Sequence, residues 1–490
     1  MGAPPPVGWR RKEQILVRGE KIYRYEKVAA DLARLIDQGT FRPGDRVPSL
    51  RGISRRMQVS ISTALEAYRL LEDRQLIEAR PQSGYYVRRL SNYGLKEPKP
   101  IRPEKSPTTV SVDELVQMVI RDSRNRNLVP LGAAVPNPDN LPVDKLNRLL
   151  AAVARRKGVQ SISYEMANGC EALRVQIARR LLAAGCSAHP QELVITSGCQ
   201  EAVALSLMAV CRPGDTVAIE SPTYFNHLQT LEVLHLKALE IPSHPASGIS
   251  FAALETALKK HRIGACLLIP NFSNPLGSLM PDEQKQALAE LIVRHDLPLI
   301  EDDIYGDLGF APERPPVVKA FDKKGLVILC SSFSKTLAPG YRIGWIHPGR
   351  FQAEIERLKT ACTIATATAP QLAVAEFLNN GGYDHHLRKI RRIYMGQIWS
   401  MTQAVSKFFP PGTRVTRPAG GFVLWVELPE YVDSLKLYEL ALQAGITIAP
   451  GPIFSIRRGY RNYIRLNAAF WSEKIEKALA LLGHLAENLK

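Results

Sequence analysis

The chain has 490 residues, and because a single hydrophobic core stops growing near roughly 250–300 residues, this length predicts at least two domains. It is 45% hydrophobic and 23% charged, a globular composition that excludes a wholly disordered or fibrous protein. The first 14 residues are charged but lack the apolar core of a secretory signal. Seven scattered cysteines without a CxxC pair indicate neither a disulfide framework nor a zinc site. We therefore expect a cytoplasmic protein without a bound metal.

The net charge of +17 is concentrated near the N-terminus. Residues 1–106 contain 22 Lys and Arg residues against 12 Asp and Glu residues, a surplus of +10, whereas the much longer remainder carries +7. A basic excess in a short segment favours a polyanionic partner there. Charge alone is equally compatible with a solvated basic surface.

A proline-rich stretch divides the chain. Residues 90–109, LSNYGLKEPKPIRPEKSPTT, contain four prolines and no helical or strand periodicity, which is typical of a semi-extended linker. The predicted domains are a small one at 21–89, a linker at 90–110 and a large one at 111–490. In the large domain apolar β-type runs alternate with helical patterns, which predicts an α/β fold with a mostly parallel sheet.

The hydrophobic pattern of the small domain predicts three helices and a hairpin. The expected elements are a helix at 25–38, a turn at 42–45, a helix after the N-cap Ser49, a helix after the N-cap Ser60, and strands at 76–80 and 85–87 around a turn at 81–84. The side chains expected to face the core are Val28, Leu32, Leu35, Ile36, Leu50, Ile53, Met57, Leu65, Tyr68 and Leu71. This order of elements is the plan of a winged helix-turn-helix.

The start of the third predicted helix suits the major groove of DNA. Its polar residues Ser60, Ser62 and Thr63 would point toward base edges and phosphates. Arginines on and before the second helix would bind the phosphate backbone, and the hairpin would approach the minor groove. The residues expected to contact DNA are Arg46, Ser49, Arg51, Ser60, Ser62, Thr63, Arg80 and Gly84, with Arg55 and Arg56 beside them. The alternative is a winged helix that binds another protein, which the clustered arginines disfavour.

One family shares this pattern. The string GTFRPGDRVPSLRGISRRMQVSISTALEAYRLLEDRQLIEARPQSGYYV closely resembles the GntR-type winged-helix regulators, above all in PGDRVPSLR and RPQSGYYV. The resemblance covers about residues 21–88 and implies that Arg51, the start of the third helix and the tip of the wing bind operator DNA. Some members carry an arginine early in the third helix where this chain has Ile61.

In the large domain, apolar runs end directly in polar residues or glycine. Five predicted strands do so, at 193–196, 217–220, 265–269, 297–300 and 326–330. Ligands of a doubly wound sheet bind outside the carboxyl ends of its strands. These five ends therefore predict one cofactor pocket.

One group of residues at these ends suits a phosphate. Gly198, Cys199 and Gln200 open a predicted helix, so their backbone N–H groups and the helix dipole attract an anion. Arg342 offers a planar guanidinium and Ser332 a hydroxyl to the same dianion.

A second group suits a pyridine ring that carries an aldehyde. Tyr224 can stack on the ring, and Asp302 can pair with its protonated nitrogen. Tyr305 and Asn274 can hydrogen-bond a phenolic oxygen, and Lys335 can form an imine with the aldehyde once it has lost its proton. Each residue alone is an ordinary turn, cap or surface residue, but their joint order at strand ends predicts pyridoxal 5′-phosphate as the cofactor.

The segments TSGCQEAV, ESPTYFNHL, NFSNPLGSLM, IEDDIYGDL and SSFSKTLAPGYRIGWI resemble the fold-type I aminotransferases of class I/II, over about residues 112–488. The resemblance implies a mostly parallel sheet flanked by helices with a small C-terminal α+β subdomain. It implies that Lys335 is the aldimine lysine and that the other residues have the roles given above. Tyr164 resembles the tyrosine that reaches the phosphate of the neighbouring subunit, and Arg465 the arginine that binds a substrate's α-carboxylate. Cys199 departs from the commoner small or hydroxyl residue, and we expect little effect because the backbone amide binds the phosphate.

Both halves in one polypeptide resemble the MocR subfamily of GntR regulators, which implies a head-to-tail homodimer with each DNA-binding module near the large domain of the other copy. Our hypothesis is a transcriptional regulator that senses pyridoxal phosphate, or an amine or amino acid that reacts with it and displaces Lys335. Two alternatives stay open. The chain could be a working aminotransferase with a DNA-binding appendage, or a repressor whose large domain serves only for dimerisation.

Overall fold

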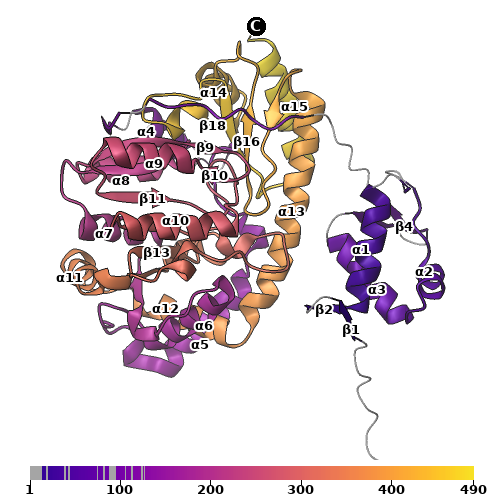
Figure 1. Cartoon of the computed structure of the whole chain (residues 1–490), viewed down its shortest axis with the longest axis horizontal. Coiled ribbons are helices and arrows are strands. Elements are labelled where there is room, and N and C mark those ends of the chain that lie inside the picture. The colour runs from indigo at the N-terminus through magenta and orange to yellow at the C-terminus, as the bar shows by residue number, and fades with distance from the viewer. Residues whose placement is uncertain are drawn as a thin grey trace, which may run out of the picture. The chain divides into compact units, whose positions relative to one another are not determined.

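The computed structural model describes residues 14–17, 20–37, 40–41, 45–73, 76–80, 83–87, 95–104, 106–111, 114–122, 125 and 127–489. The chain forms two compact units, Met1–Gly94 and Leu95–Lys490 (Figure 1). In the part of the chain that the structure describes, no helix is both long and apolar enough to span a membrane.

The small unit contains the predicted three helices and hairpin. Its elements are α1 (Arg24–Asp37), α2 (Leu50–Arg56), α3 (Ile61–Asp73), β3 (Ile77–Arg80) and β4 (Gly84–Val87). This arrangement confirms the winged helix-turn-helix. A further antiparallel pair, β1 (Gln14–Val17) and β2 (Glu20–Tyr23), precedes α1 and was not predicted. The predicted turn at 42–44 and the wing residues 81–82 lie outside the described residues.

The core of the small unit follows the predicted pattern with one difference. Val28, Leu32, Ile53, Tyr68 and Leu71 are buried, and Leu35, Ile36, Leu50 and Met57 are half-buried at its edge. Leu65 was expected to face the core but is only half-buried, because the small side chains of Ala64 and Ala67 form the buried face of α3 there. Small residues on this face allow α1 to pack closely against α3.

The large unit is built on a nine-stranded sheet. Along its main path the order is β10-β9-β8-β11-β12-β13-β14-β7, and β5 pairs with β9. The strands are β5 (Thr108–Thr109), β7 (Val194–Thr196), β8 (Thr216–Ser221), β9 (Lys237–His244), β10 (Gly248–Ile249), β11 (Ala265–Leu268), β12 (Leu299–Asp302), β13 (Val327–Ser332) and β14 (Gly344–His347). The five predicted strands are β7, β8, β11, β12 and β13. These five run in one direction, since β14 is antiparallel to both of its neighbours β13 and β7. Their carboxyl ends therefore share one edge.

Helices cover both faces of this sheet (Figure 1). On one face lie α7 (Cys199–Val210), α8 (Phe225–Val233) and α11 (Gln352–Thr363), and on the other α9 (Phe251–Lys260) and α10 (Asp282–Arg294). Successive side chains of a strand alternate between the faces, so Leu267 packs with the first set of helices and Leu268 with the second. Both are fully buried, which explains the continuous apolar runs of the sequence.

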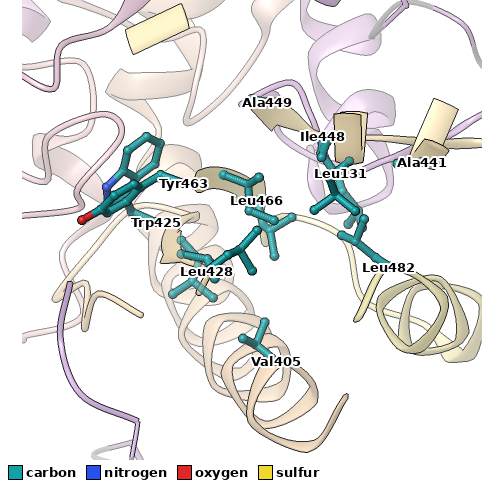
Figure 2. Close-up of a cluster of buried hydrophobic side chains, with 14 of the residues drawn as sticks. Leu131, Val405, Trp425, Leu428, Ala441, Ile448, Ala449, Tyr463, Leu466 and Leu482 are labelled. Carbon is teal, nitrogen blue, oxygen red and sulfur yellow. The ribbon is translucent and has the colours of Figure 1, made fainter. Parts of the chain in front are cut away.

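A second sheet carries the C-terminal part. It contains β15 (Arg414–Val415), β16 (Val423–Glu427), β19 (Tyr463–Asn467) and β18 (Ala449–Pro450) in that order, all antiparallel. The long helix α13 (Gly382–Phe408), α14 (Ser434–Gln443), α15 (Glu473–Glu487) and α4 (Glu114–Asp122) pack with it. Its apolar core includes Leu131, Val405, Trp425, Tyr463 and Leu466 (Figure 2). This is the small α+β subdomain that the sequence predicted.

The remaining elements complete the large unit. They are β6 (Val129–Pro130), which pairs in parallel with β17 (Ile446–Thr447), and the helices α5 (Val143–Lys157), α6 (Glu171–Leu181) and α12 (Thr368–Asn379). The described part of the proline-rich segment forms no helix, and from residue 95 onward it belongs to the large unit. Residues 90–94 of the predicted linker lie outside the described residues.

Candidate functional site

Polar residues gather where the parallel strands end. Asp302 is the last residue of β12, Ser332 ends β13, and Lys335 follows it by three positions. Gly198 precedes α7 after β7, and Tyr224 precedes α8 after β8. Because these strands are parallel, sequence segments up to about 140 residues apart reach the same edge of the sheet.

Lys335 lies at this carboxyl edge of the sheet, just after β13. Its Nζ donates a hydrogen bond to the backbone carbonyl of Ala134 at 2.6 Å and lies 5.9 Å from the centre of the Tyr305 ring. Burial, together with the nearby positive charge of Arg465, lowers the pKa of Lys335 to about 8, while Asp302 acts in the opposite direction. The side chain is therefore partly a neutral amine near pH 8, which is the nucleophilic form.

Asp302 is buried and held by three donors. Its Oδ1 accepts from the Cys199 thiol at 3.2 Å and from the Ile304 backbone N–H at 3.1 Å. Its Oδ2 lies 3.1 Å from His227 Nε2. His227 was not predicted, although it lies in the first turn of α8, three residues after the N-cap Tyr224. The two rings are 5.5 Å apart, edge to face.

Arg465 is the most deeply placed charge of the site. Only 1% of it is exposed, its Nη1 donates to Asn274 Oδ1 at 2.9 Å, and its Nη2 donates to the carbonyl of Gly132. Burial lowers its pKa. Asn274, expected to hydrogen-bond a phenolic oxygen, accepts from Arg465 through its Oδ1. The Tyr305 hydroxyl, expected to share that role, is buried without a hydrogen-bond partner, and burial raises its pKa.

The expected phosphate residues surround the N-terminus of α7. Gly198 has φ +90°, a conformation that favours glycine, and the Arg342 guanidinium lies directly against its Cα. Arg342 Nη2 donates to the Ser197 carbonyl at 3.0 Å. Ser332 Oγ accepts from the Ser334 N–H at 3.1 Å. The N-cap residue Gly198 has no side chain, so it provides no acceptor for the first N–H groups of α7.

The side chains of Cys199 and Gln200 point away from this N-terminus. The Cys199 thiol donates to Asp302, and burial raises its pKa. Gln200 Nε2 donates to Thr230 Oγ1 at 2.5 Å, on α8. Only the backbone N–H groups of these two residues are therefore available to an anion, as expected for Cys199.

Tyr164 lies apart from these residues on the surface. It is 85% exposed and belongs to a short run with three other exposed apolar residues, Val159, Ile162 and Met166. The structure does not bring it to Lys335 within one copy of the chain.

In the small unit, two of the expected DNA contacts cap helices. Ser49 Oγ accepts from the Gly52 N–H at 3.1 Å at the start of α2. Ser60 Oγ accepts from the Thr63 N–H at 3.1 Å at the start of α3, and it lies 2.8 Å from the hydroxyls of Ser62 and Thr63. Ile61 beside them is 53% exposed.

The expected arginine contacts are exposed around these helix starts. Arg51, Arg55 and Arg56 on α2 are exposed, as is Arg46 before it. The Arg46 guanidinium lies against Gly84, where a Cβ would meet it at 3.2 Å, so Gly84 lets the wing approach Arg46 closely. Arg80 pairs with Glu78 at 2.9 Å and lies over the Tyr86 ring.

The residues present fit pyridoxal phosphate. They provide a half-buried lysine of lowered pKa, a carboxylate held by three donors, an unpartnered buried tyrosine hydroxyl and an uncapped helix N-terminus beside an arginine. Among the described residues no group of three or more His, Cys, Asp and Glu side chains could hold a metal ion.

Comparison with known proteins agrees with this geometry. Residues 132–482 match the model of aminotransferase class I and II, and residues 24–87 match that of bacterial regulatory proteins of the gntR family. The chain belongs to the aminotransferase class I and II family. Its additional gntR region confirms the resemblance to MocR-type regulators, and the family is dependent on pyridoxal phosphate.

Individual relatives share one or both parts. The uncharacterized HTH-type transcriptional regulators YjiR and YdcR of Escherichia coli K12 are each 39% identical, over 94% and 95% of this chain and 98% and 99% of theirs. The crystal structure of LysN, an α-aminoadipate aminotransferase of Thermus thermophilus complexed with N-(5′-phosphopyridoxyl)-L-leucine, is 28% identical with a TM-score of 0.71. It covers 76% of this chain and 95% of its own.

Proposed function

We propose that this chain is a DNA-binding transcriptional regulator whose large unit holds pyridoxal phosphate on Lys335 and senses that cofactor, or an amine or amino acid that reacts with it. The observation that carries the proposal is the half-buried amine of Lys335, with a pKa of about 8, near Asp302 and its partner His227, in a chain that also contains a winged helix-turn-helix. The full-length similarity to proteins named transcriptional regulators supports it.

Each site residue has a part in holding the cofactor. When bound, pyridoxal phosphate supplies an aldehyde that condenses with amines and a ring that accepts electrons from a neighbouring bond. Lys335 would present its neutral amine as the nucleophile, and Asp302 would hold a proton on the ring nitrogen while His227 orients the carboxylate. Tyr305, with its unpartnered hydroxyl, and Asn274 would hydrogen-bond the phenolic oxygen, and Tyr224 would stack on the ring.

Two positive groups select the ligand's anions. Arg342, Ser332 and the N–H groups at the start of α7 hold the phosphate. Arg465 would hold the carboxylate of an incoming amino acid. A regulatory response then requires that this ligand bind two conformations of the protein unequally, by about 1–3 kcal/mol.

The proposed partners are operator DNA and a second copy of the chain. Arg46, Arg51, Arg80 and the serines at the starts of α2 and α3 contact the duplex. Exposed apolar residues around Tyr164 support a head-to-tail homodimer in which Tyr164 reaches the cofactor phosphate of the other copy. The DNA partner also supports a cytoplasmic location. Light scattering measures the mass in solution, and a monomer at micromolar concentration contradicts this arrangement.

A working aminotransferase is the second candidate function. Arg465 and the complete set of residues around Lys335 favour it, as does the likeness to LysN. Turnover of an amino acid with a 2-oxo acid above ~1 s⁻¹, the range of dedicated enzymes, would support this candidate over the regulator.

An absorption spectrum tests the proposal directly. Purified protein mixed with pyridoxal phosphate should develop a visible band that Lys335→Ala lacks, and its affinity for a duplex from its own upstream region should change when an amine is added. Absence of the band would instead support a large unit that serves only for dimerisation. A band with DNA affinity indifferent to both ligands would end the sensor proposal.

A further inference from the structure

The described part of the proline-rich segment, residues 95–104 and 106–109, is bound along the large unit, and we call it the strap. Its backbone is held at Lys99 from both sides. The Lys99 N–H donates to Glu427 Oε2 at 2.8 Å, and the Lys99 carbonyl accepts from the Tyr463 hydroxyl at 3.2 Å. The Lys96 carbonyl accepts from the Val415 N–H at 3.1 Å, at the edge of the second sheet.

A second clamp is formed by one arginine. The guanidinium of Arg457 pairs with the carboxylate of Glu104 and donates to Ser106 Oγ and Thr108 Oγ1, each at 2.8 Å. Thr108 lies in β5, which continues the large sheet by pairing with Ala238 of β9. Side chains at both ends of the strap thus bind it to the large unit, whereas a free linker would need none of them.

Each clamp includes one residue near Arg465 in the sequence, Tyr463 two positions before it and Arg457 eight positions before it. Tyr463 precedes it by two positions on β19, and residues two apart on a strand share one face. Trp425 is the cross-strand partner of Arg465 and stacks on Tyr463 with ring centres 5.5 Å apart, as Figure 2 shows for the two rings. Packing therefore connects the arginine expected to bind the ligand carboxylate to the tyrosine that holds the strap.

The other connection runs through the turn before β19. The 3₁₀ helix Gly451–Phe454 ends in Phe454, whose ring lies 5.1 Å from the Arg465 guanidinium carbon, and Arg457 follows three residues later. This turn is anchored on a buried carboxylate, because Ser455 Oγ and the Ile456 N–H both donate to Glu240. A displacement of Arg465 against Phe454 would reach Arg457 through a short, firmly held stretch of chain.

We propose that the strap reports the occupation of Arg465 to the chain that leads to the DNA-binding unit, with Arg457 and Tyr463 as the two connecting residues. The inference rests on the proposed function and specifies its regulation. In the structure the Arg465 guanidinium donates to Asn274 and Gly132, and its buried Nε has no hydrogen-bond partner, so a ligand carboxylate that accepts from this guanidinium changes its set of hydrogen bonds. That exchange shifts the guanidinium relative to Phe454 and Tyr463, and the strap loosens or tightens in response.

Hydrogen exchange of the full chain tests this without DNA. The two probes are N-(5′-phosphopyridoxyl)-L-alanine, which carries a carboxylate for Arg465, and N-(5′-phosphopyridoxyl)-ethylamine, which lacks one. We expect the alanine adduct, but not the ethylamine adduct, to change exchange of strap amides by about fivefold or more, the lower range of allosteric coupling. Arg457→Ala should abolish this change while binding both adducts as before, and Thr108→Val, which removes one hydroxyl, should reduce it. Arg357→Ala, which breaks an exposed ion pair with Glu354, is the control and should retain it.

The outcomes separate the strap from the proposed function. If neither adduct binds, the cofactor site and with it this inference are wrong. If both bind and the strap exchanges equally with each, or if Arg457→Ala keeps the full response, the strap inference is overturned while the cofactor site stands. DNA binding gives the second readout: in Arg457→Ala the alanine adduct should no longer alter affinity for the upstream duplex, although the unliganded affinity is kept.

Discussion

The surroundings of Lys335 determine the pKa of its amine. Burial and the positive charge of Arg465 lower the pKa of Lys335 to about 8, so the neutral amine increases as the pH rises through that value. Because only the neutral amine attacks an aldehyde, the rate of colour formation with pyridoxal phosphate should rise over the same range and then level off. Stopped-flow absorbance across about two pH units around this pKa measures it. Lys407→Ala, an exposed lysine, should behave as wild type, and a rate independent of pH would contradict the assignment of Lys335.

His227 provides the second prediction at this scale. Replacing it by leucine removes the partner of Asp302 Oδ2 within a buried site. A hydrogen bond to a charged group contributes about 1.5–3 kcal/mol, so we expect the dissociation constant for pyridoxal phosphate to rise roughly 10–100-fold. Equilibrium dialysis gives this constant. Cys199→Ala should cause a smaller rise, because a thiol is a weak donor, and the reverse order would refute the role of His227.

At the scale of elements, the helix starts of the small unit combine capping with expected DNA contact. Ser60→Ala removes the N-cap of α3 and should destabilise the small unit by about 1 kcal/mol. Ser60→Asp keeps a good N-cap but puts a negative charge where phosphates are expected, so stability should be kept and DNA affinity lost. Thermal unfolding followed by circular dichroism, together with duplex titration, separates the two effects. Equal DNA affinity for Ser60→Asp and wild type would remove Ser60 from the interface.

At the scale of the whole molecule, the basic excess of residues 1–106 predicts the response to salt. If several exposed arginines replace counterions on the phosphates, the logarithm of DNA affinity should fall linearly and steeply with the logarithm of salt concentration. Arg51→Ala should reduce that slope by about one. Fluorescence anisotropy at a series of salt concentrations measures both slopes. Arg357→Ala in the large unit should leave the slope unchanged, and a flat response in wild type would exclude this face.

Much of this protein follows from local sequence signals. The N-caps Ser49 and Ser60, the hairpin and the five strands ending in polar residues are written in short segments whose preferences the fold does not override. The meeting of Gly198, Asp302 and Lys335 at one edge also follows from sequence, because parallel strands align their carboxyl ends.

Other features are contacts between helices and strands that are distant in the sequence, and only the tertiary structure decided them. The pairing of His227 with Asp302, of Asn274 with Arg465 across 191 positions, and the half-exposed Leu65 come from packing between elements distant in sequence. The contacts of the strap are the feature that the sequence indicated least, because proline content predicts an extended chain but not which residues bind it. Its partners Arg457 and Tyr463 lie more than 340 residues away, a separation at which composition and periodicity carry no information about contact.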